Sequence, residues 1–479
     1  MRVLITHSYF IRLDAKQWKQ QQPYPPLATL YAAAALMREN YEIQFADIQF
    51  AHQPQEIGSY IKSFAPNTVV IYDDGFNYLT KMCLTNMRQA CMEMIKMAKR
   101  AGCKIIVSSS DSTDHPEYYL QAGADYILHG EGEQTLCVLL DYIKANKDAS
   151  ELEGIIYLKN EVAIKNAART VLKNLDTLAA PAWQLLDFTL YKKAWEKSAG
   201  YISINLATTR GCPFKCNWCA KPIYGNRYNS HSVDFIIEQI KLVTQQFGVT
   251  HIWFCDDIFG LKPGWISQFA DALTDSNLKI KFKIQCRADL LLQGDTIAHL
   301  ARAGCDEVWI GAESGSQQVL DAMDKGITLA QIAQATYLLK KHGIKPCFFI
   351  QFGYPGETRE DINKTIDMVH QLQPADIGVS VSYPLPGTPF YERVKAELNS
   401  KANWTDSDDL ALMFANTYPK EFYKTLQRYL HRRFRALQSK TFVSNQGGYS
   451  KHNSFAANAL AWPYHRLLQE YYSLKLKQY

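Results

Sequence analysis

The most informative loop of the chain is Thr209-Arg210-Gly211-Cys212-Pro213-Phe214-Lys215-Cys216-Asn217-Trp218-Cys219, which lies between an apolar run and a helical pattern. Its cysteines Cys212, Cys216 and Cys219 have C-x3-C-x2-C spacing. A structural zinc site needs four protein ligands, whereas each cysteine of a cuboidal iron–sulfur cluster binds one iron, and four are usual. Three thiolates therefore predict a 4Fe-4S cluster with one iron open to a small molecule. Zinc with a distant fourth ligand is the alternative that the spacing leaves open.

The composition is that of an ordinary soluble globular protein. The chain has 479 residues, of which 47% are hydrophobic and 21% charged, and a formal net charge of +5. This length predicts roughly two to four domains, and so small a charge favours neither nucleic acid nor an anionic membrane as a partner. We find no apolar run that would make an integral membrane segment, and residues 1–7 are too short for a signal peptide. Eleven cysteines without a dense short-chain framework indicate reduced thiols and a cytoplasmic location.

Residues 1–145 alternate short apolar runs with helical patterns. Short buried strands separated by helices predict an α/β fold with a doubly wound parallel sheet, and such sheets bind ligands beyond the carboxyl ends of their strands. Methionines and cysteines at helical spacing from Leu79 to Ile95 predict a packed helix face. The expected strands are residues 3–6, 43–47, 69–72, 105–108 and 126–129.

Three further segments follow. Residues 146–200 are expected to be a connector with a small hairpin around Lys159-Asn160-Glu161. Residues 201–389 repeat a βα unit, which predicts a full or partial barrel with its catalytic groups at the carboxyl ends of the strands. Residues 390–479 are predicted to form a helical, aromatic-rich C-terminal region. The expected barrel strands are residues 202–208, 251–255, 282–286, 307–312, 347–352 and 378–382.

Charged residues follow two of these barrel strands at the end where ligands bind. Asp256 and Asp257 form an acidic pair after the second strand, and the alternative is that one of them caps a helix. Arg287 follows the third strand. An arginine there can hold a carboxylate through two parallel hydrogen bonds, and a buried ion pair with Asp289 is the alternative.

In their order along the chain, these motifs resemble those of the radical S-adenosylmethionine (SAM) enzymes, which have a partial (β/α)6 TIM barrel. Gly311-Ala312-Glu313-Ser314-Gly315, after the fourth strand, resembles the motif whose glutamate contacts the SAM ribose. The resemblance implies that the open iron binds SAM and that Trp218 lies near the adenine. It also implies that the acidic pair lies near SAM or the substrate. Pro-Gly loops at residues 353–358 and 383–389 match a subgroup that carries cobalamin domains.

The N-terminal unit resembles the Rossmann-like cobalamin-binding domain of cobalamin-dependent radical SAM enzymes. The resemblance rests on its place before the barrel and on two motifs. These are Tyr24-Pro25-Pro26-Leu27-Ala28-Thr29-Leu30 after the first strand and His129-Gly130-Glu131-Gly132-Glu133 after the fifth. It implies that cobalamin approaches the backbone at Gly130 and Gly132 and that residues 73–78 lie over the corrin.

Two features depart from that family's pattern. The Asp-x-His-x-x-Gly motif, which supplies a cobalt ligand in methionine-synthase-like domains, is missing. Ser108-Ser109-Ser110-Asp111 stands after the fourth strand, where the family often has Gly-Gly. We expect Ser109 to hydrogen-bond the nucleotide tail of cobalamin, and loss of the cofactor is the alternative that the serines leave open.

Together the resemblances imply a cobalamin-dependent radical SAM methyltransferase (class B) acting on an unactivated carbon. The implied cofactors are a 4Fe-4S cluster, SAM and cobalamin, and the implied partners are a small-molecule substrate and a reductant such as flavodoxin or ferredoxin. The chain also resembles the anaerobic magnesium-protoporphyrin monomethyl ester cyclase group, which is the first alternative. A transfer-RNA methylthiotransferase is a further alternative, although those enzymes carry three more cysteines for a second cluster. A non-catalytic metal-binding protein is the last.

Overall fold

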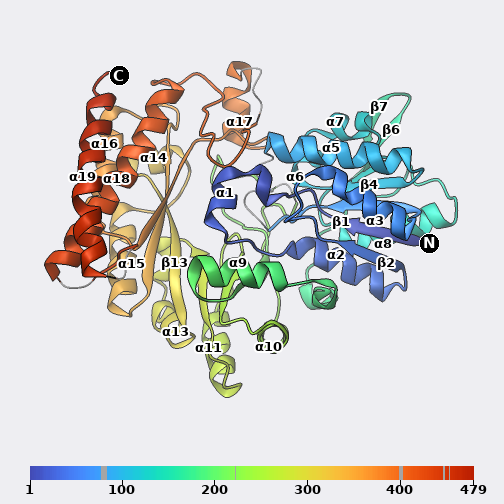
Figure 1. Ribbon diagram of the computed structural model, residues 1–479, viewed down its shortest axis with the longest axis horizontal. Helices are drawn as coiled ribbons and strands as arrows, with labels where there is room; N and C mark the ends of the chain where they lie inside the picture. Colours follow the sequence, from blue (N-terminus) through green and yellow to red (C-terminus); the bar gives the residue numbers. More distant parts are fainter. Residues whose placement is uncertain (77–83, 222, 399–402, 446–447, 452–453) are drawn as a thin grey trace.

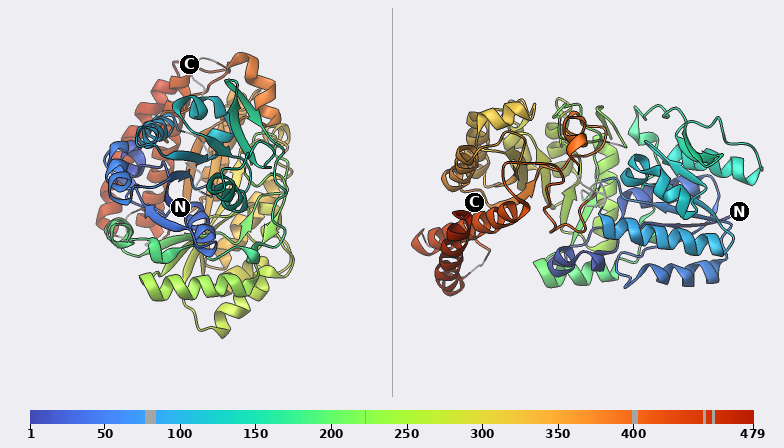
Figure 2. Two further views of the ribbon diagram at one scale, coloured as in Figure 1. Left: turned by 90° about the vertical axis from the view of Figure 1, so that its right-hand side faces the viewer. Right: turned by 90° about the horizontal axis from the view of Figure 1, so that it is seen from above.

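Two sheets of mainly parallel strands carry the fold, and each has its own covering helices (Figure 1). The computed structural model describes residues 1–76, 84–221, 223–398, 403–445, 448–451 and 454–479. The N-terminal sheet lies at one end of the molecule, the second sheet in the middle, and two long C-terminal helices at the other end (Figures 1 and 2). Within these described segments, every helix is too short or too polar to cross a membrane.

The N-terminal sheet has the strand order β2-β1-β3-β4-β5-β6-β7. Strands β1 to β5 are parallel neighbours, and the antiparallel hairpin β6–β7 extends the sheet at one edge. The order 2-1-3-4-5 is that of flavodoxin-like doubly wound domains, which confirms the predicted fold class. The hairpin belongs to this sheet, although the sequence had placed it in a connector. The strands are β1 (Arg2–Thr6), β2 (Glu42–Ala46), β3 (Thr68–Tyr72), β4 (Lys104–Ser108), β5 (Tyr126–Leu128), β6 (Ile155–Lys159) and β7 (Val162–Lys165).

Helices cover both faces of this sheet, as its apolar strands require. The central strand β3 is buried along its whole length, which is typical of a strand covered on both sides. In α5 the predicted stripe is buried at Met87, Cys91 and Met94, whereas its beginning from Leu79 to Cys83 lies outside the described residues. Helices in contact are α2 (Leu27–Arg38) with α8 (Glu133–Lys144), and α3 (Ile57–Phe64) and α7 (Pro116–Ala122) with α5 (Thr85–Arg100).

The second sheet is an open half-barrel with the order β8-β11-β12-β13-β14-β15. All its neighbouring strands are parallel, and among the described residues the outer strands β8 and β15 do not pair with each other. The predicted partial barrel is therefore confirmed. The strands are β8 (Ser203–Leu206), β11 (His251–Phe254), β12 (Lys281–Cys286), β13 (Cys305–Glu313), β14 (Lys345–Phe352) and β15 (Asp376–Val381). The helices between and after them include α10 (Val233–Phe247), α11 (Trp265–Asp275), α13 (Thr296–Arg302), α14 (Gln317–Ala322), α15 (Leu329–Lys341) and α16 (Arg359–Leu372).

The C-terminal region is helical, as predicted. Helix α17 (Pro389–Val394) is short, and the long helices α18 (Lys420–Asn445) and α19 (Phe455–Leu476) pack along each other. Helix α18 lies against α16 and the outer strand β15. The irregular segment before α18 returns to the N-terminal half, where the Ser407 hydroxyl donates to Asp14 Oδ1 at 2.8 Å and Thr85 N donates to Trp404 O at 2.8 Å.

A buried ion triad joins the two sheets. Arg210, at the start of the cysteine loop, lies 2.6 Å from Glu133 and 3.3 Å from Glu131, both of which follow β5. All three residues are buried, and the rings of Tyr31 and Tyr224 lie 5.5 and 5.1 Å from the guanidinium carbon. The carboxyl edge of the N-terminal sheet therefore meets the loop that begins at the carboxyl edge of the half-barrel.

Replacing Arg210 with alanine should destabilise the protein strongly, because Glu131 and Glu133 would stay buried without their cation. Removal of one partner from a buried pair typically lowers the free energy of unfolding by about 3–5 kcal/mol, and urea unfolding would measure it. Arg302→Ala is the matched control, since Arg302 pairs with Asp271 at 2.6 Å while both side chains are about half exposed. The control should lose less than about 1 kcal/mol. Equal losses in the two variants would contradict the importance given to the triad.

Candidate functional site

The cysteine loop is fixed at its start by backbone pairing and by a buried carboxylate. Strand β9 (Thr209–Arg210) pairs with β10 (Asn229–Ser230). At Gly211 the φ angle is +80°, and a Cβ would lie 2.4 Å from the Arg227 carbonyl oxygen, so only glycine fits. Asp256, at the end of β11, accepts hydrogen bonds from Thr208 N and Thr209 N, both at 2.7 Å. The first aspartate of the predicted acidic pair thus anchors the loop.

The environments of the two aspartates differ. Asp256 is buried, and burial raises its pKa to about 7 even though the Thr208 and Thr209 donors oppose the shift. Asp257 is exposed, and its charge contributes to raising the pKa of Cys212 and of Cys219. Asp257, and not Asp256, therefore stands beside the predicted cluster site.

The three loop cysteines are partly exposed thiols. Burial is the main cause that raises the pKa of Cys212 and takes that of Cys219 to about 11, and each is raised further by its neighbouring thiols. Among the residues that the structure describes, no three His, Cys, Asp or Glu side chains converge as ligands of one metal ion would. A cuboidal cluster does not require such convergence, because each of its cysteines binds a different iron.

Arg287 lies beside Cys216, with Nη1 4.0 Å from the sulfur. Its guanidinium stacks over the Phe214 ring at 3.9 Å and is held by Asp289 through two bonds of 2.9 and 3.0 Å. It also donates to the Lys325 carbonyl oxygen at 2.7 Å. The ion pair with Asp289, left open by the sequence, is present, and it points the arginine at the cysteine loop.

A buried ion pair of Glu313 and Lys325 lies behind the loop. Lys325 Nζ is 2.8 Å from Glu313 Oε1 and 5.8 Å from the centre of the Trp218 ring. Burial acts to lower the pKa of Lys325, but the charges of Glu313 and Cys216 outweigh it, so the pKa is raised. A Cβ at Gly311 would lie 2.5 Å from this ammonium, which explains the glycine. Glu313 and Trp218, both predicted site residues, are thus brought together, whereas sequence analysis assigned no role to Lys325.

The Trp218 indole gives one observation that points to a bound group. Its Nε1 is buried and has no hydrogen-bond partner among the residues that the structure describes. A buried N–H normally finds an acceptor, so a ligand with acceptor atoms would satisfy it. This orphaned donor and the adjacent thiols fit the predicted cluster and SAM.

Asn217 is a further candidate site residue, which the sequence did not reveal. Its Nδ2 donates to Ala322 O at 2.8 Å and to Asp324 Oδ2 at 2.9 Å. The Tyr354 hydroxyl lies 2.9 Å from its Oδ1, and its backbone oxygen accepts from Phe390 N at 3.0 Å. This one residue between Cys216 and Cys219 thus ties the loop to three other segments, two through its side chain and one through its backbone. Its position between Cys216 and Trp218 was the only available signal.

Each of the predicted cobalamin contacts also has a structural role within the protein. A Cβ at Gly132 would lie 2.7 Å from the Tyr72 hydroxyl, and Gly130 has a φ angle of +78°. Ser109 caps the short helix α6 (Ser110–Asp114), because its hydroxyl accepts from Ser112 N at 2.9 Å. Local structure alone thus accounts for the residue types at Gly130, Gly132 and Ser109. The neighbouring glutamates, Glu131 and Glu133, bind Arg210. Asn77 and Tyr78 of the predicted corrin-facing loop lie outside the described residues.

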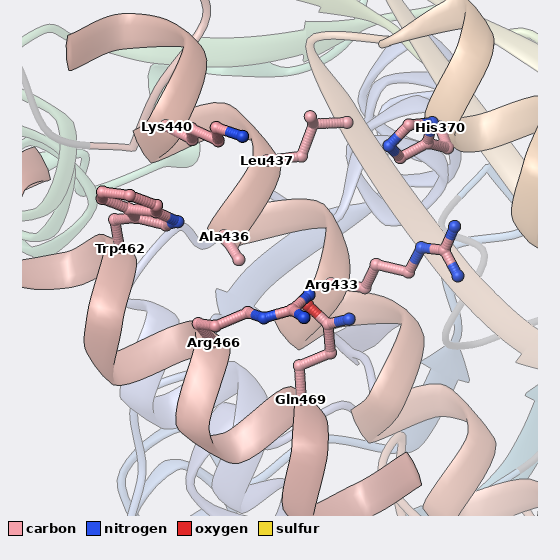
Figure 3. Close-up of a pocket in the computed structure, with 8 residues that line it drawn as sticks. All are labelled: His370, Arg433, Ala436, Leu437, Lys440, Trp462, Arg466 and Gln469. Atoms are coloured by element: carbon pink, nitrogen blue, oxygen red, sulfur yellow. The ribbon is translucent and has the colours of Figure 1, made fainter. Parts of the chain in front are cut away.

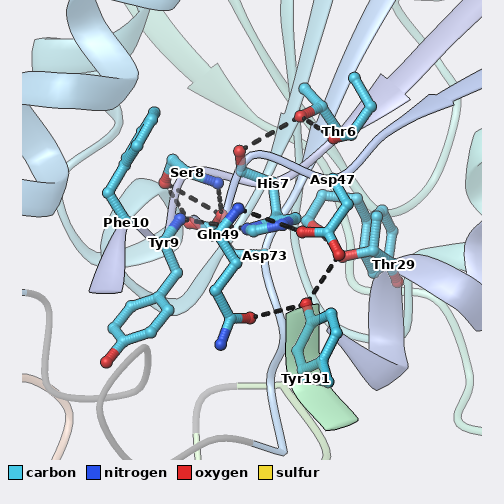
Figure 4. Close-up of polar contacts among 12 residues, drawn as sticks. Thr6, His7, Ser8, Tyr9, Phe10, Thr29, Asp47, Gln49, Asp73 and Tyr191 are labelled. Atoms are coloured by element: carbon cyan, nitrogen blue, oxygen red, sulfur yellow. Dashed lines mark hydrogen bonds and ion pairs between the residues drawn. The ribbon is translucent and has the colours of Figure 1, made fainter. Parts of the chain in front are cut away.

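A polar network occupies the carboxyl ends of β1 to β3 (Figure 4). Ser8 N donates to Asp73 Oδ1 at 2.6 Å, and the Ser8 hydroxyl donates to Asp73 Oδ2 at 2.8 Å. His7 Nε2 lies 3.0 Å from Asp47 Oδ1, and the Tyr191 hydroxyl donates to Asp47 Oδ2 at 2.7 Å. Burial raises the pKa of Asp73, although Ser8 opposes it. This edge is where a doubly wound sheet binds its ligands.

Residues 206–369 match the family model described as the Radical SAM superfamily. This chain contains a radical SAM domain. Among curated relatives, an uncharacterized methyltransferase from Pyrococcus horikoshii is 27% identical over 391 residues, which cover 79% of this chain and 81% of that protein. The anaerobic magnesium-protoporphyrin IX monomethyl ester cyclase of Synechocystis is 23% identical and matches 72% of this chain and 67% of that protein.

Two solved structures share the fold. The radical SAM methyltransferase TsrM from Kitasatospora setae, solved with cobalamin and a 4Fe-4S cluster, has a TM-score of 0.68 at 18% identity and covers 82% of this chain and 74% of its own. The cobalamin-dependent SAM radical enzyme OxsB, solved with aqua-cobalamin, has a TM-score of 0.75 at 18% identity and covers 99% and 72%. Both structures therefore share the fold of most of this chain.

Replacing Asn217 with alanine should weaken cluster binding, because the loop loses its hydrogen bonds to Ala322, Asp324 and Tyr354. Mutation of a residue that orients a metal ligand typically lowers metal affinity by about 10–100-fold. Iron and sulfide retained after anaerobic reconstitution and a chelator challenge would measure the loss. Asn363→Ala, an exposed change on α16, is the control and should retain the wild-type iron content. Equal retention by both variants would remove the role given to Asn217.

Glu357 should make stability pH-dependent. It follows β14, is 2% exposed and accepts from Gly353 N at 2.6 Å, while burial raises its pKa from 4.5 to about 8. Between these two values the folded state holds a proton that the unfolded state has lost. The free energy of unfolding should therefore be highest below the unfolded pKa and fall as pH rises toward about 8, by a few kcal/mol in all.

Urea unfolding of Glu357→Gln would check this, because the amide resembles the protonated acid. Between about pH 5 and about pH 8.5 the variant should lose less stability than the wild type. Glu421→Gln changes an exposed glutamate in α18 and should keep the wild-type slope. Parallel slopes for wild type and Glu357→Gln would show that Glu357 is ionised in the fold.

Proposed function

We propose that this protein is a cobalamin-dependent radical SAM methyltransferase that acts on an unactivated carbon. One observation carries the proposal. The cysteine loop at the carboxyl edge of the half-barrel meets, through Arg210, the carboxyl edge of a 2-1-3-4-5 sheet. Ligands of both fold types bind at these edges, so the two cofactor sites would face each other.

The half-barrel would supply the residues that bind the cluster and SAM. Cys212, Cys216 and Cys219 would hold the 4Fe-4S cluster, and the cationic groups of Arg287 and Lys325 would lower the cost of charge on Cys216. Glu313, held by Lys325, would bind the SAM ribose, and Trp218 would lie near the adenine. When bound, the cluster supplies the electron that cleaves SAM, and cobalamin carries the methyl group.

The N-terminal unit, residues 1–145, would bind cobalamin. Residues 146–200 would connect it to the barrel at 201–389, and residues 390–479 would close the substrate side. The support is the placement of the sheet edge and the likeness of fold to TsrM and OxsB, whose structures hold cobalamin. No histidine is supplied to cobalt by an Asp-x-His-x-x-Gly motif. A small-molecule substrate, a cytoplasmic location and a flavodoxin or ferredoxin as reductant complete the proposal.

An oxidative cyclase is the second candidate, since the Synechocystis cyclase matches 72% of this chain. It would use the same cluster residues, but the relative with higher identity is named a methyltransferase. A methylthiotransferase would need a second set of cysteines in the N-terminal unit. In the described part of that unit, Cys91, Cys103 and Cys137 do not converge, and Cys83 lies outside it.

The test is to produce the protein without oxygen and with cobalamin supplied, and to measure bound corrinoid, iron and products from SAM. We expect near-stoichiometric corrinoid and, with a strong reductant, both 5'-deoxyadenosine and S-adenosylhomocysteine. The control is the variant with Cys212, Cys216 and Cys219 all changed to alanine. It should bind corrinoid normally and release no 5'-deoxyadenosine.

Protein with iron and sulfide but without corrinoid would overturn the cobalamin part of the proposal. Bound corrinoid with 5'-deoxyadenosine and no S-adenosylhomocysteine would favour the cyclase. Cleavage of SAM by the triple-alanine variant at the wild-type rate would overturn the assignment of the cluster site.

A further inference from the structure

The outer face of α19 carries a continuous apolar stripe. Leu460, Leu467 and Leu474 are 76%, 72% and 63% exposed, and Tyr464 and Tyr471 between them are 55% and 48% exposed. Single exposed apolar residues are common on protein surfaces, but contiguous patches of them mark interaction sites. The stripe is therefore a candidate interface.

The spacing of the stripe is that of a coiled-coil seam. The leucines recur every seven residues, and each tyrosine lies three residues before the next leucine. In heptad notation the leucines occupy d and the tyrosines a, which are the two positions that face a partner helix. The stripe covers 15 of the 22 residues of α19, from Leu460 to Leu474, which is about two heptads and about 22 Å of helix. Pro463, inside the helix, falls at a g position beside the seam.

The opposite face of α19 is already covered by this protein. Asn458, Gln469 and Leu476 are buried, and α19 packs along α18. A groove of about 450 Å³ between α16, α18 and α19 is lined by Trp462, Arg466 and Gln469 from the inner side of α19 (Figure 3). A contiguous apolar stripe on one face of a helix is normally buried against another element. Arg432 of α18 reaches the edge of the stripe, with its guanidinium carbon 5.3 Å from the centre of the Tyr464 ring, but the three leucines stay largely exposed.

Charges beside the stripe indicate which helix would cover it. Glu470 occupies a g position and Lys475 the following e position. In two parallel helices, g of one lies near the following e of the other, and such pairs set partner choice and orientation. Two copies of α19 in parallel would therefore make the Glu470–Lys475 pair twice. The bond of 2.8 Å from Arg466 to Glu470 holds this carboxylate beside the stripe.

We propose that α19 forms a parallel coiled-coil interface between two copies of this chain. The arrangement is isologous, because each copy offers the same residues to the other across a two-fold axis. The remainder of each copy lies behind α18, on the side away from the seam (Figure 1). The cysteine loop and the carboxyl edge of the N-terminal sheet would then remain open, since neither of these sites contributes a residue to the stripe.

Sedimentation equilibrium of the full-length protein over a range of concentrations tests the proposal. We expect a reversible dimer, and Leu467→Glu should raise its dissociation constant at least about tenfold, because a charge would be buried in the seam. Tyr337→Glu is the matched control, since Tyr337 is 65% exposed on α15. Its dimer should dissociate as in the wild type, and circular dichroism should show the same helix content in all variants.

A charge exchange tests the orientation without touching the seam. Glu470→Lys alone and Lys475→Glu alone should each weaken the dimer, and the double variant should restore it, because the pair is re-formed with its signs reversed. A protein that stays monomeric at every concentration would overturn the proposal. If that monomer bound anionic lipid vesicles, a membrane surface and not a second copy would cover the stripe. A dimer unaffected by Leu467→Glu would overturn it as well, because another surface would then hold the copies together. Absence of rescue would overturn the parallel arrangement.

Discussion

The contact of Arg210 with Glu131 and Glu133 is the constraint on which the rest of the structure depends. It is buried, so its charges are satisfied by one another, by the surrounding rings and by Leu172 N, which donates to Glu131 Oε2 at 2.5 Å. Arg210 directly precedes the glycine that opens the cysteine loop, and the glutamates directly follow β5. A shift of one sheet relative to the other would therefore expose or separate three buried charges, which is far more costly than a change in a surface pair. Local backbone geometry and domain orientation are fixed by the same side chains.

The cysteine loop shows how the strands of a parallel half-barrel hold an irregular segment in place. Three cysteines cannot fix their own positions before a metal is bound, because they form no disulfide among themselves. The neighbouring strands do this instead. Asp256 from β11 holds the entry of the loop through backbone N–H groups, and Arg287 beyond β12 stacks on Phe214. Asn217 joins the far end to the segment after α14. The scaffold is thus distributed over elements far apart in sequence.

Sequence periodicity predicted the strands of both sheets to within a few residues, because buried parallel strands are short apolar runs with clear boundaries. It predicted less of the site. Nothing local distinguishes Asp256, which anchors backbone, from the exposed Asp257, since their difference arises from the hydrogen bonds of Asp256 to Thr208 and Thr209, which follow β8. Gly132 was predicted to let cobalamin approach the backbone, and the structure gives a further reason for a glycine there, because a Cβ would lie 2.7 Å from the Tyr72 hydroxyl. Lys325 and Asn217 act through tertiary contacts that no motif encodes.

The two outer strands of an open half-barrel could pair with another chain unless they are covered. Here the covers come from opposite ends of the sequence. At β15 the cover is α18, whose Arg435 lies 2.7 Å from Asp376 and whose Gln438 donates to Ala375 O at 2.8 Å. At β8 it is the Tyr24-Pro25-Pro26 segment, where Asn205 Nδ2 donates to Pro25 O at 3.1 Å. Proline has no N–H to extend a sheet, so it suits a segment that covers an edge without adding a strand. The Tyr24-Pro25-Pro26 motif, which suggested a cofactor domain in the sequence, thus also has a structural role. It covers the outer strand of the half-barrel on the side of the N-terminal sheet.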